Sequence, residues 1–104
     1  MAKTIQLLTA RCGKIRPDSV ADYLAHDGFS ALKKAMNMSP MEIINEVIDA
    51  KLLGRGGASY PAGKKWKQLY EIEGDPKYIV CNADEGEPGT FKDKVLLEKD
   101  PLSI

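Results

Sequence analysis

The apolar positions along most of this chain recur every three to four residues, which is the spacing of one buried helix face. This spacing predicts helices that start near Pro17, Phe29, Pro40, Lys64 and Phe91, with helix stops at Gly28 and Gly54. The clearest start is at Pro40, because Ser39 and Glu42 have the spacing of a reciprocal capping box. The apolar stripe that follows it consists of Ile43, Ile44, Val47, Ile48 and Leu52.

Two short segments have strand character instead. Residues 4–10 tolerate a β conformation, and Lys77–Asn82 is apolar and β-branched, which is typical of a buried strand. With helices before and after these segments, the pattern predicts an α/β fold in which a small sheet is surrounded by helices.

Length and charge narrow the range of functions. The chain has 104 residues, so it has room for one domain at a typical ~150 residues each. Its 15 basic and 15 acidic residues balance, which argues against a dedicated binder of nucleic acid or of an anionic membrane. No apolar run approaches the ~20 residues that span a bilayer, and Met1–Thr4 does not resemble a secretory signal. We therefore expect a cytoplasmic protein without direct membrane insertion.

Two further features concern the cysteines and the end of the chain. Cys12 and Cys81 are too few for a disulfide framework or a metal cage, and we expect both to be buried thiols.

Asp100 and Pro101 have the character of a helix start, yet only three residues follow them. A helix that starts without a body predicts that this sequence has been cut from a longer one, and a frayed tail is the alternative.

A glycine-rich loop at residues 54–63 is the first candidate for chemistry. It holds four of the nine glycines but matches neither the dinucleotide fingerprint nor the phosphate-binding P-loop. Its bare backbone would let a flat ring or a phosphate approach the main-chain N–H groups. Tyr60 is suited to stack on an aromatic base, and Arg55 and Lys65 add positive charge. The alternative is an ordinary linker between two helices.

An acidic loop directly after the predicted strand at residues 77–82 is the second candidate. Asn82, Asp84, Glu85 and Glu87 fall within six residues and are accompanied by glycines that permit tight turns. Carboxylates in such a position accept hydrogen bonds from ribose hydroxyls. The alternative is a solvated turn, and the spacing of a calcium-binding loop is absent.

Together the two loops resemble a known family. The segments GRGGASYPAGKKW (54–66) and YIVCNADEGEPGT (78–90) are similar to the motifs of the flavin subunit of NADH dehydrogenase (complex I), which also occurs in NAD-linked hydrogenases and formate dehydrogenases. The stretch at residues 11–15 is closest to the hydrogenase branch. The resemblance implies that residues 1–104 are part of an FMN- and NADH-binding domain, with a helical segment at 14–53, the glycine loop at 54–63, and the strand and acidic loop at 77–90.

The resemblance also implies roles for individual residues. FMN would contact Gly54, Gly56, Lys65, Asn82, Asp84 and Glu85, with Arg55 and Gly57 in the same loop. NADH would contact Glu87 and Tyr60, where Tyr60 replaces the Phe of the family motif. Ser59 replaces a family Gly, and its added Cβ would tighten or distort the loop. The [4Fe-4S] cluster that receives the electrons would lie in a later part of the protein, and other subunits of an electron-transfer complex are the expected partners.

Two other classes of function stay open at this stage. One is a non-catalytic interaction module that keeps the fold, binds a partner protein and holds no flavin. The other is a nucleic-acid binder that uses residues 64–67 and the Arg55–Gly57 triplet, although a single basic cluster on a neutral chain is more often a solvated helix face.

Overall fold

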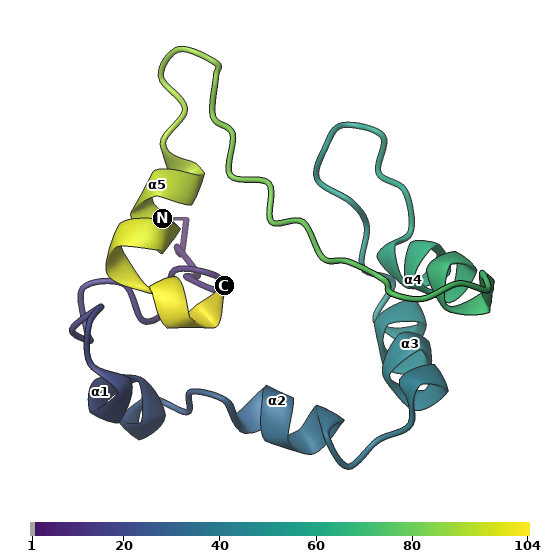
Figure 1. The fold of residues 1–104 in the computed structure, drawn as a ribbon. Helices are drawn as coiled ribbons and strands as arrows, with labels where there is room; N and C mark the ends of the chain where they lie inside the picture. Colours follow the sequence, from purple (N-terminus) through teal and green to yellow (C-terminus); the bar gives the residue numbers. More distant parts are fainter. Residues whose placement is uncertain (1) are drawn as a thin grey trace. The chain divides into compact units, whose positions relative to one another are not determined.

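The computed structural model describes residues 2–104, and helices are its main regular element (Figure 1). They are α1 Val20–Ala25, α2 Ser30–Ala35, α3 Pro40–Asp49, α4 Ala62–Glu71, α5 Lys92–Lys99 and the short 3₁₀ helix η1 Pro101–Ser103. The chain forms two compact units. The first unit contains the residues up to Ala31 together with Val80–Ile104, and the second unit contains Leu32–Ile79.

The start of α3 confirms the predicted capping box. The Ser39 hydroxyl accepts from the backbone N–H of Glu42 at 3.2 Å, and the Glu42 carboxylate accepts from the backbone N–H of Ser39 at 2.6 Å. The hydrogen bond that the carboxylate accepts from the Ser39 backbone N–H is the main cause of a lowered pKa for Glu42. The helix ends at Asp49, before the predicted stop at Gly54, because Lys51 already turns the backbone with a φ of 53°.

In the first unit, α1 and the turn after it pack around Tyr23. The backbone N–H of Gly28 donates to the Tyr23 carbonyl at 2.8 Å, and a Cβ on Gly28 would overlap Cδ1 of the Tyr23 ring. The ring also meets the Phe29 ring edge-to-face, with the centroids 4.8 Å apart. The predicted stop at Gly28 thus follows α1, and its reason is this close approach to the Tyr23 ring.

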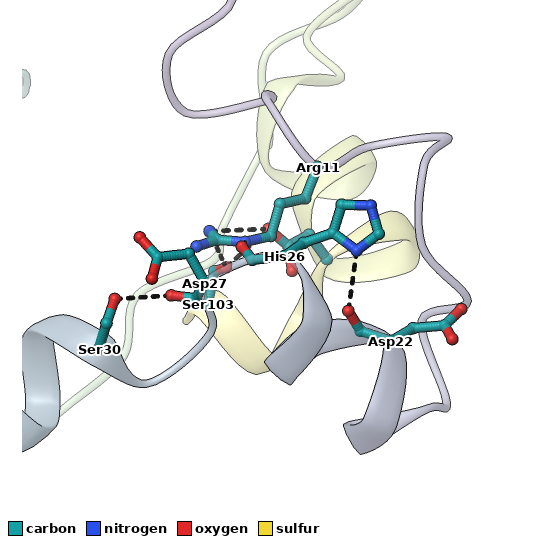
Figure 2. A network of polar contacts seen from close by, with 7 residues as sticks. Arg11, Asp22, His26, Asp27, Ser30 and Ser103 are labelled. Atoms are coloured by element: carbon teal, nitrogen blue, oxygen red, sulfur yellow. Dashed lines mark hydrogen bonds and ion pairs between the residues drawn. The ribbon is translucent and has the colours of Figure 1, made fainter.

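Arg11 ties several parts of the first unit together (Figure 2). Its guanidinium donates to the His26 carbonyl at 2.8 Å and to the Ser103 hydroxyl at 3.3 Å, and it lies over the Tyr23 ring at 5.1 Å. The carboxylate of Asp100 is 3.9 Å from the guanidinium, is only 1% exposed, and accepts from the Ser103 hydroxyl at 2.6 Å. This network joins the N-terminal segment to α1 and η1 through polar contacts.

In the second unit, α3 and α4 pack directly against each other (Figure 1). The contact depends on Gly63, which is buried near the start of α4. A Cβ at this position would lie 2.5 Å from Cγ1 and 2.7 Å from the backbone nitrogen of Ile48. Because glycine has no side chain, the two helix backbones can approach this closely.

The predicted small sheet is absent from residues 2–104, where the only β pairing is an isolated bridge between Leu53 and Pro61. Both strand predictions are therefore wrong for this structure. Residues 4–10 are irregular and then turn, and the Lys77–Asn82 segment is exposed, with Ile79 fully so. An apolar, β-branched sequence forms a strand only when a neighbouring strand accepts its backbone hydrogen bonds, and these segments have no such neighbour within residues 2–104.

The cysteine prediction also requires correction. Cys81 is exposed because it lies in the segment that forms no strand, and Cys12 is half-buried. No helix among the described residues is long and apolar enough to cross a membrane.

Candidate functional site

The glycine loop is closed at its base by backbone hydrogen bonds. The N–H of Gly54 donates to the Tyr60 carbonyl at 2.7 Å, and the N–H of Ala62 donates to the Leu52 carbonyl at 2.9 Å. These two bonds flank the bridge between Leu53 and Pro61. The loop is therefore a defined hairpin-like turn between α3 and α4 and not a slack linker.

Within this loop, two glycines leave the backbone open. A Cβ on Gly56 or Gly57 would meet no atom within 4 Å, and Gly57 has a φ of 102° that side-chain-bearing residues rarely adopt. Gly54 is different, because its Cβ position already touches the Tyr60 carbonyl at 3.4 Å. Ser59, which replaces a glycine of the family motif, has a φ of 51°. The middle of the loop thus offers main-chain atoms to a ligand, while its base is packed.

The loop's side chains make local contacts. The Tyr60 hydroxyl donates to the side-chain oxygen of Gln68 at 3.2 Å, and the Lys64 ammonium lies 5.9 Å from the Tyr60 ring centroid. The Arg55 guanidinium donates to the Leu53 carbonyl at 3.0 Å. Lys65 is exposed in the early part of α4. Tyr60 is 40% exposed, so part of its ring stays accessible while these contacts fix its position.

The acidic loop is organised mainly by its own side chains. The Asn82 side-chain oxygen accepts from the backbone N–H of Asp84 at 2.9 Å, which forms a local turn. A second turn follows, where the N–H of Thr90 donates to the Glu87 carbonyl at 3.2 Å and Gly89 has a φ of 84°. The loop therefore holds its shape without a strand before it.

Glu85 makes the longest-range contacts of the acidic loop. Its carboxylate accepts from the backbone N–H of Asp93 and, at 3.4 Å, from that of Lys94, both in the first turn of α5. The Lys92 ammonium is 3.9 Å from the same carboxylate and 2.9 Å from Asp93. The hydrogen bond to Asp93 raises the pKa of Lys92. Glu85 is the one side chain of the loop that joins it to a helix.

These residues surround a hollow of about 340 Å³ in the first unit. It is lined by Asp84, Glu85, Gly86, Glu87, Thr90 and Lys92. The carboxylates can accept hydrogen bonds from ligand hydroxyls, and the lysine supplies a positive charge for a phosphate. Among the residues that the structure describes, no three His, Cys, Asp or Glu side chains are arranged so that they could hold a metal ion together.

The predicted site residues thus form two groups, each within one unit. Lys65 adjoins the glycine loop in the second unit, and the acidic loop forms the hollow in the first unit. Lys92 is a member of the hollow that sequence reasoning did not select. The signal for it was available, since a basic residue at the start of a helix that follows an acidic loop can pair with that loop's carboxylates. The predicted site residues within the glycine loop are Gly54, Arg55, Gly56, Gly57 and Tyr60.

Comparison with known sequences places both loops in one family. The sequence model of the Nuo51 FMN-binding domain matches residues 47–104, which is more than half of the chain and includes both loops. The chain belongs to the Nuo51 FMN-binding domain family. The matched region of the chain therefore contains the glycine loop, the acidic loop and α5, whose contacts are described above.

Proteins from several bacteria are similar in sequence to this chain. One subunit of the NADH-quinone oxidoreductase of Aquifex aeolicus is 52% identical over 98 residues, which cover 94% of this chain and 23% of the relative. One subunit of the NADP-reducing hydrogenase of Solidesulfovibrio fructosivorans is 44% identical over 102 residues, which cover 98% of this chain and 21% of the relative. The chain spans about a fifth to a quarter of the length of these relatives.

Proposed function

We propose that this chain forms one part of the FMN- and NADH-binding site of an NADH-oxidising flavoprotein. The observation that carries the proposal is the pair of ordered loops, one with open backbone and one with clustered carboxylates, in a chain that is 52% identical to part of an NADH-quinone oxidoreductase. Bound FMN would accept a hydride from NADH and release electrons singly to a [4Fe-4S] cluster outside these residues.

The glycine loop fits a flavin because its middle is free of side chains. A planar ring or a phosphate can approach Gly56 and Gly57, where no neighbouring atom lies within 4 Å of a Cβ position. In our proposal, Gly54 holds the turn closed from its base, and Arg55 and Lys65 supply positive charge toward the FMN phosphate. Tyr60 stacks on the adenine of NADH, an interaction of roughly 0.5–1.5 kcal/mol beyond burial.

The acidic loop fits the hydroxyl-bearing parts of both molecules. Asn82 and Asp84 are adjacent in a fixed turn, and we assign them to FMN. Glu87 is exposed at the same hollow, and we assign it to NADH. Carboxylates at this place can accept hydrogen bonds from the hydroxyl groups of these ligands.

We further propose that this chain, taken alone, does not turn over NADH. The two relatives described above are roughly four to five times longer, and they are named as parts of an NADH-quinone oxidoreductase and of a hydrogenase. Other subunits of an electron-transfer complex in the cytoplasm are therefore its proposed partners. A non-catalytic interaction module that never holds flavin is the alternative that an experiment must separate.

The experiment is a visible absorbance spectrum of the native protein, purified from its source through an affinity handle at this N-terminus. Flavin bands that bleach on addition of NADH are expected. A colourless protein that responds neither to NADH nor to added FMN would contradict the proposal and favour the interaction module.

Two test substitutions and one control substitution in the same protein sharpen this test. Lys65→Ala is expected to lower the flavin-to-protein ratio, whereas Lys67→Ala, on the same helix but paired with Glu71 at 3.9 Å, is expected to leave it unchanged. Glu87→Gln is expected to weaken the NADH response while flavin stays bound. Loss of FMN from the Glu87 variant, or an unchanged ratio in the Lys65 variant, would refute the role given to that residue.

A further inference from the structure

The first turn of α5 has backbone donors that its own cap residue does not satisfy. Phe91 occupies the N-cap position, and its side chain makes no capping hydrogen bond. The N–H groups of Asp93 and Lys94 instead donate to the two carboxylate oxygens of Glu85, eight and nine residues away. A carboxylate is the favoured partner here, because the first turn of a helix carries a partial positive charge.

The environment of Glu85 shows that its carboxylate is committed to this helix. Its side chain is 12% exposed, far less than that of Lys92 at 73%, and the lysine compensates its charge from 3.9 Å. Both oxygens already accept a backbone hydrogen bond. Asp84 and Glu87, by contrast, are exposed. Of the three acidic residues of the loop, Glu85 is therefore bonded to α5, whereas Asp84 and Glu87 are exposed to solvent.

The contact with α5 also fixes where the loop lies. Two residues, Asp84 and Glu87, line the same hollow as Glu85, and the turn closed by Thr90 leads from the loop to α5. If the Glu85 carboxylate were released, only the short turns within the loop would hold Asp84 and Glu87 in place. Their orientation toward a ligand then depends on a group that need not touch the ligand itself.

We infer that Glu85 is a positioning residue, which anchors the acidic loop on the N-terminus of α5 and leaves Asp84 and Glu87 to contact the ligand. The expected effect on FMN binding rests on the proposed function. The anchoring of the acidic loop on α5 does not depend on it. It replaces the direct flavin contact that the family resemblance implies for Glu85.

The test combines two measurements on the native protein, before and after flavin removal. Amide hydrogen exchange reports whether the Asp93 and Lys94 N–H groups are protected, and quenching of FMN fluorescence gives the Kd for FMN. Glu85→Ala is expected to speed exchange at these two amides about tenfold in the flavin-free protein, the scale on which loss of a helix cap acts. The Kd for FMN is expected to rise by about tenfold as well.

Two further variants serve as controls. Glu85→Gln keeps the shape and one acceptor oxygen, so it is expected to fold and to give smaller changes in the same direction. Glu98→Gln removes an acidic residue of α5 that is 60% exposed and only pairs with Lys94, and both measurements are expected to stay at wild-type values.

The outcomes separate the possible roles of Glu85. A weaker FMN affinity with unchanged exchange at Asp93 and Lys94 would mean a direct ligand contact and would overturn the inference. Faster exchange with unchanged FMN affinity would mean a purely structural cap and would overturn it too. If the wild-type protein binds no FMN, the proposed function fails, while the exchange measurement alone still supports or refutes the anchoring.

Discussion

Replacing Gly63 with alanine tests the packing that holds the glycine loop between α3 and α4. The new Cβ would lie 2.7 Å from the Ile48 backbone nitrogen, whereas ordinary contacts begin at 3.4 Å. A side chain could rotate away from this contact, but a helix backbone cannot. The two helices would therefore have to separate by about 0.7 Å, the difference between these two distances, at their closest point.

The magnitude follows from two opposing effects of Gly63→Ala. Overpacking of a buried contact costs about 1–3 kcal/mol, and a backbone clash belongs at the upper end of that range. Alanine favours a helix over glycine by up to ~1 kcal/mol, and less near a helix start. The expected loss is about 2 kcal/mol in the free energy of unfolding, with Tm lower by about 4–8 °C for each kcal/mol.

The assay is urea unfolding followed by far-UV circular dichroism, with Gly56→Ala as the matched control. Gly56 lies in the same region, and its Cβ would meet nothing within 4 Å, so this variant should stay within about 0.5 kcal/mol of wild type. A second Ile48→Ala substitution removes the Cγ1 contact but not the backbone contact, and it should reduce the Gly63→Ala penalty without abolishing it. A Gly63→Ala protein as stable as wild type would refute the packing argument.

Three further substitutions have defined expectations. Ser39→Ala removes the N-cap hydroxyl of α3 and should cost about 1 kcal/mol in chemical unfolding. The bond that mainly lowers the pKa of Glu42 comes from the backbone N–H of residue 39, which alanine keeps. Its stabilising contribution is present above about pH 4.5 and is lost as the pH falls through the lowered value, so the acid titration of this variant should keep most of the wild-type slope. Arg11→Ala leaves the buried carboxylate of Asp100 without its cation and should destabilise by roughly 1–3 kcal/mol in thermal unfolding; an unchanged Tm would show that the pair is neutral. Ser59→Gly relieves a φ of 51° and should stabilise by about 0.5–1 kcal/mol after the entropy cost of glycine, and a loss of stability would contradict the strain.

The two candidate loops differ in what fixes them. The glycine loop is closed by main-chain hydrogen bonds between residues 52–54 and 60–62, so its shape depends little on side-chain identity. The acidic loop instead depends on the side chains of Asn82 and Glu85. We therefore expect substitutions in the second loop to disturb its shape more strongly than substitutions in the exposed middle of the first.

The sequence by itself determined the features that arise within a few residues. Apolar spacing and the caps at Ser39 and Gly28 predicted the helices, because helix hydrogen bonds and caps join residues no more than four or five positions apart. The motif resemblance was equally a property of the sequence, and the match of the FMN-binding domain to residues 47–104 confirmed it.

Only the tertiary structure decided what depends on distant neighbours. Lys77–Asn82 has the composition of a strand but forms none among residues 2–104, because a strand needs a second strand to complete its backbone hydrogen bonds. From the sequence alone, Gly63 cannot be told apart from the other glycines of the loop, yet it is the point where α4 contacts Ile48 of α3. In the sequence, Glu85 is one of several acidic residues in the loop. Its hydrogen bonds to α5 in the structure distinguish it from the others. In each case the deciding partner lies beyond the reach of local spacing.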